Sequence, residues 1–118
     1  MHEMSICQGL MSQVEKIARD KGASQVDSIV LSIGPLSGVE PELLSRAFLI
    51  ARAGTVAKNA GLEIETGPII VECRSCGVSG EARVNRLLCR SCDSWQVNLK
   101  QGDELLLMRL ELSGIETD

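Results

Sequence analysis

Four cysteines form the strongest chemical pattern in the chain. Two identical Cys-Arg-Ser-Cys units, separated by twelve residues, contain Cys73 and Cys76 in the first and Cys89 and Cys92 in the second. Each unit directs two sulfurs at one point, so the two units together offer the tetrahedral set of thiolates that suits zinc. Because four thiolates leave no open coordination position, we expect a structural zinc that replaces the hydrophobic core of a short ribbon.

Disulfides, a redox dithiol and an iron–sulfur cluster are the alternatives to zinc for these four thiols. Two disulfides or a redox dithiol would suit an oxidising compartment, and four thiolates can also hold an iron–sulfur cluster. The chain begins MHEMSICQ, without the basic and apolar stretches of a secretory signal, so we expect it to be cytoplasmic. Paired Cys-x-x-Cys units are then more typical of a metal site than of disulfides.

Three further residues belong to the predicted ribbon, and a fifth cysteine lies outside it. Gly77 and Asp93 follow the two units, and both residue types tolerate the left-handed backbone that a tight turn needs. Trp95 is expected to pack over the metal site, or else to be an ordinary core aromatic. Cys7 stands apart from the pairs and is interpreted as a small buried hydrophobe.

The amino terminus offers a second set of metal ligands. His2 is the only histidine, and a terminal histidine by itself is usually just a solvated end of the chain. However, the amine of Met1, the amide nitrogen of His2 and its imidazole can chelate one ion. Such a nitrogen-rich, roughly planar set suits Ni(II) or Cu(II). Binding requires the loss of amine and amide protons, so the affinity should rise with pH.

Two carboxylates accompany this set. Glu3 follows His2 directly and can add an oxygen ligand, while Glu40 precedes the Pro41 that opens a second predicted helix. Both also have an ordinary explanation, since acidic side chains are common near helix N-termini, where they complement the helix dipole.

Composition excludes two classes of partner. The net charge of −4 argues against nucleic acid, which requires a basic surface. No apolar stretch approaches the roughly 20 residues of a membrane helix. The chain has almost no aromatic residues, so its core must be aliphatic.

Apolar periodicity predicts an α/β (α+β) domain with an inserted ribbon. A helix is expected from an N-cap at Ser5, with Gln8 completing a capping box, to Gly22. A strand over 25–33, the helix from Pro41 and a strand over 62–66 follow. Two helices should cover one face of a small three-stranded sheet. The predicted domains are 1–70 with 103–118, and a zinc ribbon over 71–102.

The third strand of that sheet is expected after the ribbon. Leu106, Met108, Leu110 and Leu112 alternate with charged residues and are expected to face the helices. The segments 69–71 and 105–112 enter and leave the ribbon, so they are expected to pair antiparallel.

Taken together, these motifs resemble the HypA/HybF family, the nickel metallochaperones of nickel–iron hydrogenase maturation. The resemblance covers nearly the whole chain and rests on the Met1-His2-Glu3 start, the stretch from Ser37 to Leu44, the stretch from Gly54 to Ala57, and the paired cysteines. It implies a nickel domain that uses His2 and the chain terminus, and a Cys₄ zinc domain. It also implies delivery of nickel to the hydrogenase large subunit with a partner GTPase, and some members serve urease. Glu40 stands where some members have Asp, and Arg90 where members often have Pro.

Three functions therefore compete. The first is a metal-delivery protein that binds nickel and hands it on by protein contact. The second, an enzyme, is disfavoured because no open-site ligand set, Ser/His/Asp grouping or phosphate-binding glycine loop is present. The third is a zinc-ribbon interaction module without transferable metal.

Overall fold

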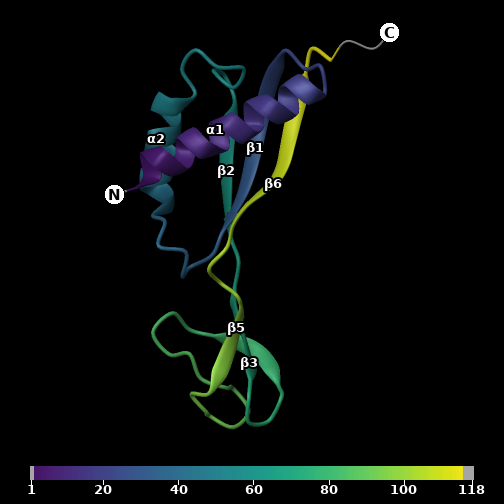
Figure 1. The fold of residues 1–118 in the computed structure, drawn as a ribbon. Coiled ribbons are helices and arrows are strands. Elements are labelled where there is room, and N and C mark those ends of the chain that lie inside the picture. The colour runs from purple at the N-terminus through teal and green to yellow at the C-terminus, as the bar shows by residue number, and fades with distance from the viewer. Residues whose placement is uncertain (1, 116–118) are drawn as a thin grey trace. The chain divides into compact units, whose positions relative to one another are not determined.

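The computed structural model describes residues 2–115 and contains two helices and two small sheets (Figure 1). The first sheet has the strand order β2-β1-β6, and the second has the order β4-β3-β5. Within residues 2–115, no helix combines the length and the apolar character needed to cross a bilayer. In chain order the elements are α1 (Glu3–Asp20), β1 (Gln25–Ile33), α2 (Pro41–Ala51), β2 (Gly61–Thr66), β3 (Ile69–Cys73), β4 (Ser79–Ala82), β5 (Val97–Gln101) and β6 (Leu105–Ser113).

The chain divides into two compact units. The helical unit comprises Met1–Leu31, Val39–Ile64 and Leu107–Asp118, and the cysteine unit comprises Ser32–Gly38 and Glu65–Leu106. The core of the helical unit is aliphatic except for one phenylalanine, as the composition predicts. α1, α2 and β1 supply its fully buried members, which include Cys7, Val14, Leu44, Phe48, Ile29 and Leu31. The predicted α+β class is therefore confirmed.

Helix α1 begins three residues earlier than the predicted capping box allows. The N-cap is His2 rather than Ser5, and both Ser5 and Gln8 lie inside the helix. The backbone N–H of Ile6 donates to the carbonyl of His2 at 3.1 Å, and Glu3 places an acidic group in the first turn. Such a charge is favourable at this end of the helix dipole. As a consequence, His2 is attached directly to a regular helix.

The predicted pairing of 69–71 with 105–112 is wrong. Strand β3 pairs antiparallel with β4 and β5, whereas β6 lies beside β1. β6 is the edge of its sheet, and Leu106 and Met108 are 51% and 55% exposed, while Met108 and Leu110 line a shallow hollow together with Ile17 of α1. Period-2 alternation identified the strand correctly, but it contains no information about which neighbour the strand selects.

The central strand of the cysteine unit is β3. Ile69, Val71 and Cys73 alternate along it and are all buried. At the end of this strand Cys73 is paired with Val97 of β5, and Glu72 is paired with Ser79 of β4. Both flanking strands therefore fix the position of the first cysteine.

Gly34 approaches another backbone segment of the cysteine unit too closely for any side chain. Its N–H donates to the carbonyl of Glu104 at 2.8 Å, and the N–H of Leu36 donates to the carbonyl of Gly102 at 2.6 Å. A Cβ atom on Gly34 would lie 2.1 Å from the carbonyl oxygen of Gly102. Glycine is therefore required where these two segments bond to each other.

We expect Gly34→Ala to lower the free energy of unfolding by about 1–3 kcal/mol, because the segments must separate to admit the methyl group. Gly9→Ala is the matched control. Gly9 lies within α1 with no atom within 4 Å of the added Cβ, so this change should stabilise the protein by about 0.5–1 kcal/mol. Urea unfolding of the two variants measures both effects, and equal stability of the two would contradict the packing argument.

Candidate functional site

The four cysteines of the two Cys-Arg-Ser-Cys units meet in the cysteine unit. All four sulfurs lie within 4.8 Å of one another. The Sγ atoms of Cys73 and Cys92 are 3.6 Å apart, and those of Cys76 and Cys89 are 3.5 Å apart. Four sulfurs at 2.3 Å from a tetrahedral zinc would be about 3.8 Å apart, whereas a disulfide requires about 2.05 Å. The four side chains are free thiols arranged at the spacing of a tetrahedral metal site.

Each unit is closed by the same local turn. The N–H groups of Ser75 and Cys76 donate to the Cys73 sulfur at 3.3 and 3.4 Å, and those of Ser91 and Cys92 donate to Cys89 at 3.4 Å each. The sequence analysis did not identify these serine N–H donors. Each serine nevertheless stands at a fixed place, two residues after the cysteine whose sulfur accepts its N–H. The predicted left-handed turns are confirmed, since Gly77 has φ 76° and Asp93 has φ 59°.

These contacts divide the thiols into two pairs. N–H donation from Cys76, and from Ser75, lowers the pKa of Cys73 to about 6 despite burial. N–H donation from Cys92 and Ser91 likewise lowers the pKa of Cys89.

The two remaining thiols resist ionisation. The N–H of Ser94 favours the Cys92 thiolate, but the Cys73 sulfur and burial outweigh it and raise the pKa of Cys92 to about 12. In the same way, the N–H of Val78 is outweighed by the Cys89 sulfur and burial, so the pKa of Cys76 is raised. A cluster that opposes its own complete ionisation needs a cation before all four sulfurs can carry charge.

Trp95 does not pack over this cluster. Its side chain is 72% exposed, so both expectations for it, a cover for the metal site and a core aromatic, are wrong. The backbone carbonyl of Trp95 instead accepts the N–H of Val97 at the start of β5. The turn after Cys92 is closed by backbone atoms, with the N–H of Asp93 donating to the carbonyl of Cys89 at 2.9 Å.

The predicted ligands at the amino terminus lie where the starts of two helices meet. Met1 falls outside the described residues. His2 is exposed at the N-cap of α1, Glu3 is 7% exposed in its first turn, and Glu40 is the exposed N-cap of α2. The N-terminal ammonium group and, to a smaller extent, the backbone N–H groups of Glu3 and Glu40 lower the pKa of Glu3 to about 2. Residues 37 positions apart in sequence are thus brought together in the helical unit.

Cys7 does not join the metal cluster. It is fully buried one turn after Glu3, and its thiol contacts the carbonyl oxygen of Leu44 at 3.5 Å. Burial raises the pKa of Cys7, and the charge of Glu3 raises it further. The interpretation of Cys7 as a small buried hydrophobe is confirmed, and the structure adds that it lies between α1 and α2.

Comparison with known proteins identifies one family. A sequence profile described as "Hydrogenase/urease nickel incorporation, metallochaperone, hypA" matches residues 1–112. The chain is 49% identical over 112 residues to the hydrogenase maturation factor HypA of Nitrosospira multiformis, covering 95% of this chain and 97% of that protein. Its identity to HypA of Aquifex aeolicus is 41%, with the same coverage.

Solved structures lead to the same family. The solution structure of the Ni metallochaperone HypA from Helicobacter pylori aligns with a TM-score of 0.73 at 30% identity, covering 96% of this chain and 98% of that one. Similarity in sequence and fold extends over nearly the full length of both chains. The chain therefore belongs to the HypA family of nickel metallochaperones for hydrogenase maturation.

Proposed function

We propose that the chain carries one transferable Ni(II) at its amino terminus and one structural Zn(II) at its four cysteines, and delivers the nickel to a hydrogenase. The observation that carries the nickel site is the meeting of His2, Glu3 and Glu40 at the starts of α1 and α2. Met1 and His2 supply the nitrogens, Glu3 an oxygen, and Glu40 is a further candidate ligand.

The surroundings of these residues suit a metal that must be released. The exposed imidazole of His2 leaves the ion open to a partner, while its backbone is held by the first hydrogen bond of α1. Glu3 is ionised and nearly buried, so it can compensate the charge of a bound cation without needing to lose a proton first. Nickel is therefore the cargo of this site rather than a resident cofactor.

The cysteine cluster suits a metal that stays. Its four thiolates fill a tetrahedral shell, and two of the sulfurs, those of Cys73 and Cys89, are buried. We assign zinc to it because Zn(II) accepts tetrahedral thiolate ligands without a competing geometric preference. No reaction is assigned to either site, and the protein acts as a carrier rather than as an enzyme.

The partners follow from the family. A hydrogenase-maturation GTPase and the hydrogenase large subunit are the proposed contacts in the cytoplasm, and a urease maturation protein is a further acceptor. Direct delivery is tested by incubating the nickel-loaded, zinc-replete chain with the GTPase and nickel-free large subunit in the presence of EDTA. Nickel should reach the large subunit from the chain but not from an equal amount of nickel salt. Equal incorporation from both sources would contradict direct transfer.

We expect the two metal sites to be only weakly coupled. The cysteines belong to the cysteine unit, whereas His2, Glu3 and Glu40 belong to the helical unit. Removal of zinc should weaken nickel binding by less than about tenfold, which corresponds to roughly 1 kcal/mol of coupling. Calorimetric nickel titration of zinc-free protein, with circular dichroism to verify its helices, measures this. Complete loss of nickel binding by a protein that is still helical would indicate that a cysteine serves as a nickel ligand.

A further inference from the structure

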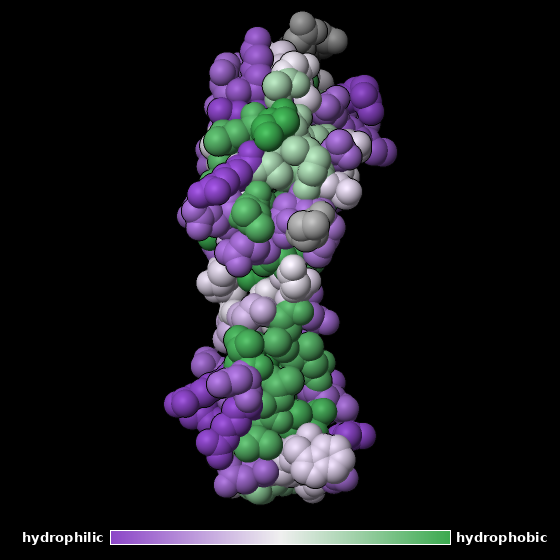
Figure 2. All heavy atoms as spheres, turned by 90° about the vertical axis from the view of Figure 1, so that its left-hand side faces the viewer, coloured by the Kyte–Doolittle hydropathy of each residue, from purple (hydrophilic) through white to green (hydrophobic). Residues whose placement is uncertain are grey.

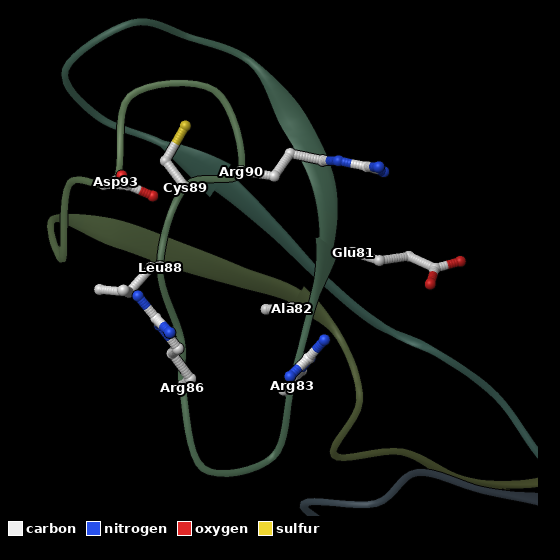
Figure 3. A pocket seen from close by; sticks show the side chains of 8 residues that line it. All are labelled: Glu81, Ala82, Arg83, Arg86, Leu88, Cys89, Arg90 and Asp93. Carbon is white, nitrogen blue, oxygen red and sulfur yellow. The ribbon is translucent and has the colours of Figure 1, made fainter.

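The cysteine unit contains a hollow of about 240 Å³ that is lined by arginine and that shares only Cys89 with the two metal sites (Figure 3). Three arginines contribute to its wall, together with two acidic side chains and with Ala82, Leu88 and Cys89. In Figure 3 the Glu81 side chain extends away from Leu88 and Cys89. The charged residues and the leucine that line the hollow are Arg83, Arg86, Arg90, Leu88, Glu81 and Asp93.

Local structure brings the three arginines together. Arg83 and Arg86 form an isolated antiparallel bridge, and the N–H of Arg86 donates to the carbonyl of Arg83 at 3.0 Å. Arg90 comes from the second cysteine turn, and its stem crosses Gly80 of β4. A Cβ on Gly80 would lie 2.5 Å from Cδ of Arg90, so this strand glycine leaves the space through which the arginine passes.

None of these three guanidinium groups has an ion-pair partner within residues 2–115. Other charged side chains do pair there, as Arg46 does with Glu42 and Lys16 with Asp20. Three cations without an ion-pair partner make the wall of this hollow positive, and Glu81 and Asp93 offset part of that charge. A guanidinium group binds a carboxylate through two parallel hydrogen bonds, so the hollow is suited to carboxylate groups.

The surroundings favour a peptide over a free anion. Leu88 forms part of the wall, and Val84, in the turn between Arg83 and Arg86, is 59% exposed. An apolar side chain of a ligand could cover both. Figure 2 shows that hydrophobic side chains also gather on one face of this unit. The overall negative charge of the chain disfavours nucleic acid.

We propose that this arginine hollow is a docking site for an acidic segment of a partner protein in which carboxylates alternate with apolar residues. The site lies wholly within the cysteine unit, so the proposal is independent of nickel binding. One competing explanation is that the arginines only balance the metal centre, since Cys89 also lines the hollow and zinc with four thiolates has a net charge of −2.

Nuclear magnetic resonance can test the proposal on the zinc-loaded full chain. The probe is the peptide acetyl-Glu-Leu-Glu-Leu-Glu-amide, and the control peptide has Gln in place of every Glu. The acidic peptide should shift the Nε–Hε signals of Arg83, Arg86 and Arg90, and its affinity should fall as salt is added. Arg90→Gln should weaken binding roughly fivefold, and Arg83→Gln with Arg86→Gln should weaken it by more than about tenfold.

Arg74→Gln is the matched control. Arg74 occupies the same place in the first cysteine unit as Arg90 does in the second, beside a buried sulfur, but it does not line the hollow. It should change the peptide affinity by less than about twofold. The proposal is overturned by equal weakening in Arg74→Gln and Arg90→Gln, by equal shifts with the Gln peptide, or by displacement of the peptide by equimolar inorganic phosphate. The second and third results need no variant, so misfolding cannot obscure them.

Discussion

Replacing Cys73 by alanine should abolish metal binding in the cysteine unit and unfold that unit while α1 and α2 remain helical. The Cys73 sulfur is buried, accepts two N–H groups and ends the central strand β3. Metal binding at a structural zinc site contributes about 10–16 kcal/mol to folding in small modules. A unit with short strands and a small core cannot compensate for that loss.

Cys7→Ala is the control for this experiment. Cys7 is also a buried cysteine, but its thiol contacts Leu44 in the helical unit and lies outside the four-cysteine cluster. This variant should keep one zinc per chain. Metal analysis measures the zinc content of both variants, and circular dichroism shows whether their helices remain folded. A full complement of zinc in Cys73→Ala would refute the four-cysteine assignment.

Replacing His2 by alanine should weaken nickel binding by more than about 100-fold. Loss of a residue that only supports a metal ligand typically costs 10–100-fold in affinity, so loss of the imidazole ligand itself should cost more. For the unmodified protein, affinity should rise with pH, because the amine and amide protons must leave before the nitrogens can bind. Copper should bind the same site more tightly than nickel, following the general order of divalent metals.

Two carboxylates at the start of α2 complete this test. Glu40→Gln should weaken nickel binding by less than the His2 substitution if Glu40 contributes a secondary ligand. Glu42→Gln is the matched control, since Glu42 pairs with Arg46 at 2.9 Å one helical turn away. It should leave the affinity unchanged. Undiminished one-to-one nickel binding by the His2→Ala protein would place the site elsewhere.

The cysteine site could be predicted from the sequence because its geometry is local. A Cys-x-x-Cys turn fixes the separation of its own two sulfurs, and Gly77 and Asp93 marked the two left-handed residues. Only the meeting of the two turns is non-local, and a tetrahedral metal demands it. The two helices and the nine-residue strands β1 and β6 were also accessible from apolar periodicity.

What the sequence could not supply was the choice of neighbours. Nothing in the alternation of Leu106 and Met108 distinguishes an edge strand beside β1 from a partner of β3. The approach of Glu40 to Glu3 depends on how α1 and α2 pack, and the arginine hollow depends on the bridge between Arg83 and Arg86. The exposure of Trp95 is likewise not encoded in the local pattern around it.

The most direct test of the nickel site is calorimetric titration of zinc-loaded protein with and without a Gly-Ser extension before Met1. The extension keeps every side chain but moves the terminal amine out of chelation range of His2. We predict that the unmodified protein binds one nickel per chain, and that the extended protein loses this binding while retaining its zinc. Equal nickel binding by the two proteins would contradict the account and would leave a zinc-ribbon interaction module without a transferable metal at this terminus as the better description.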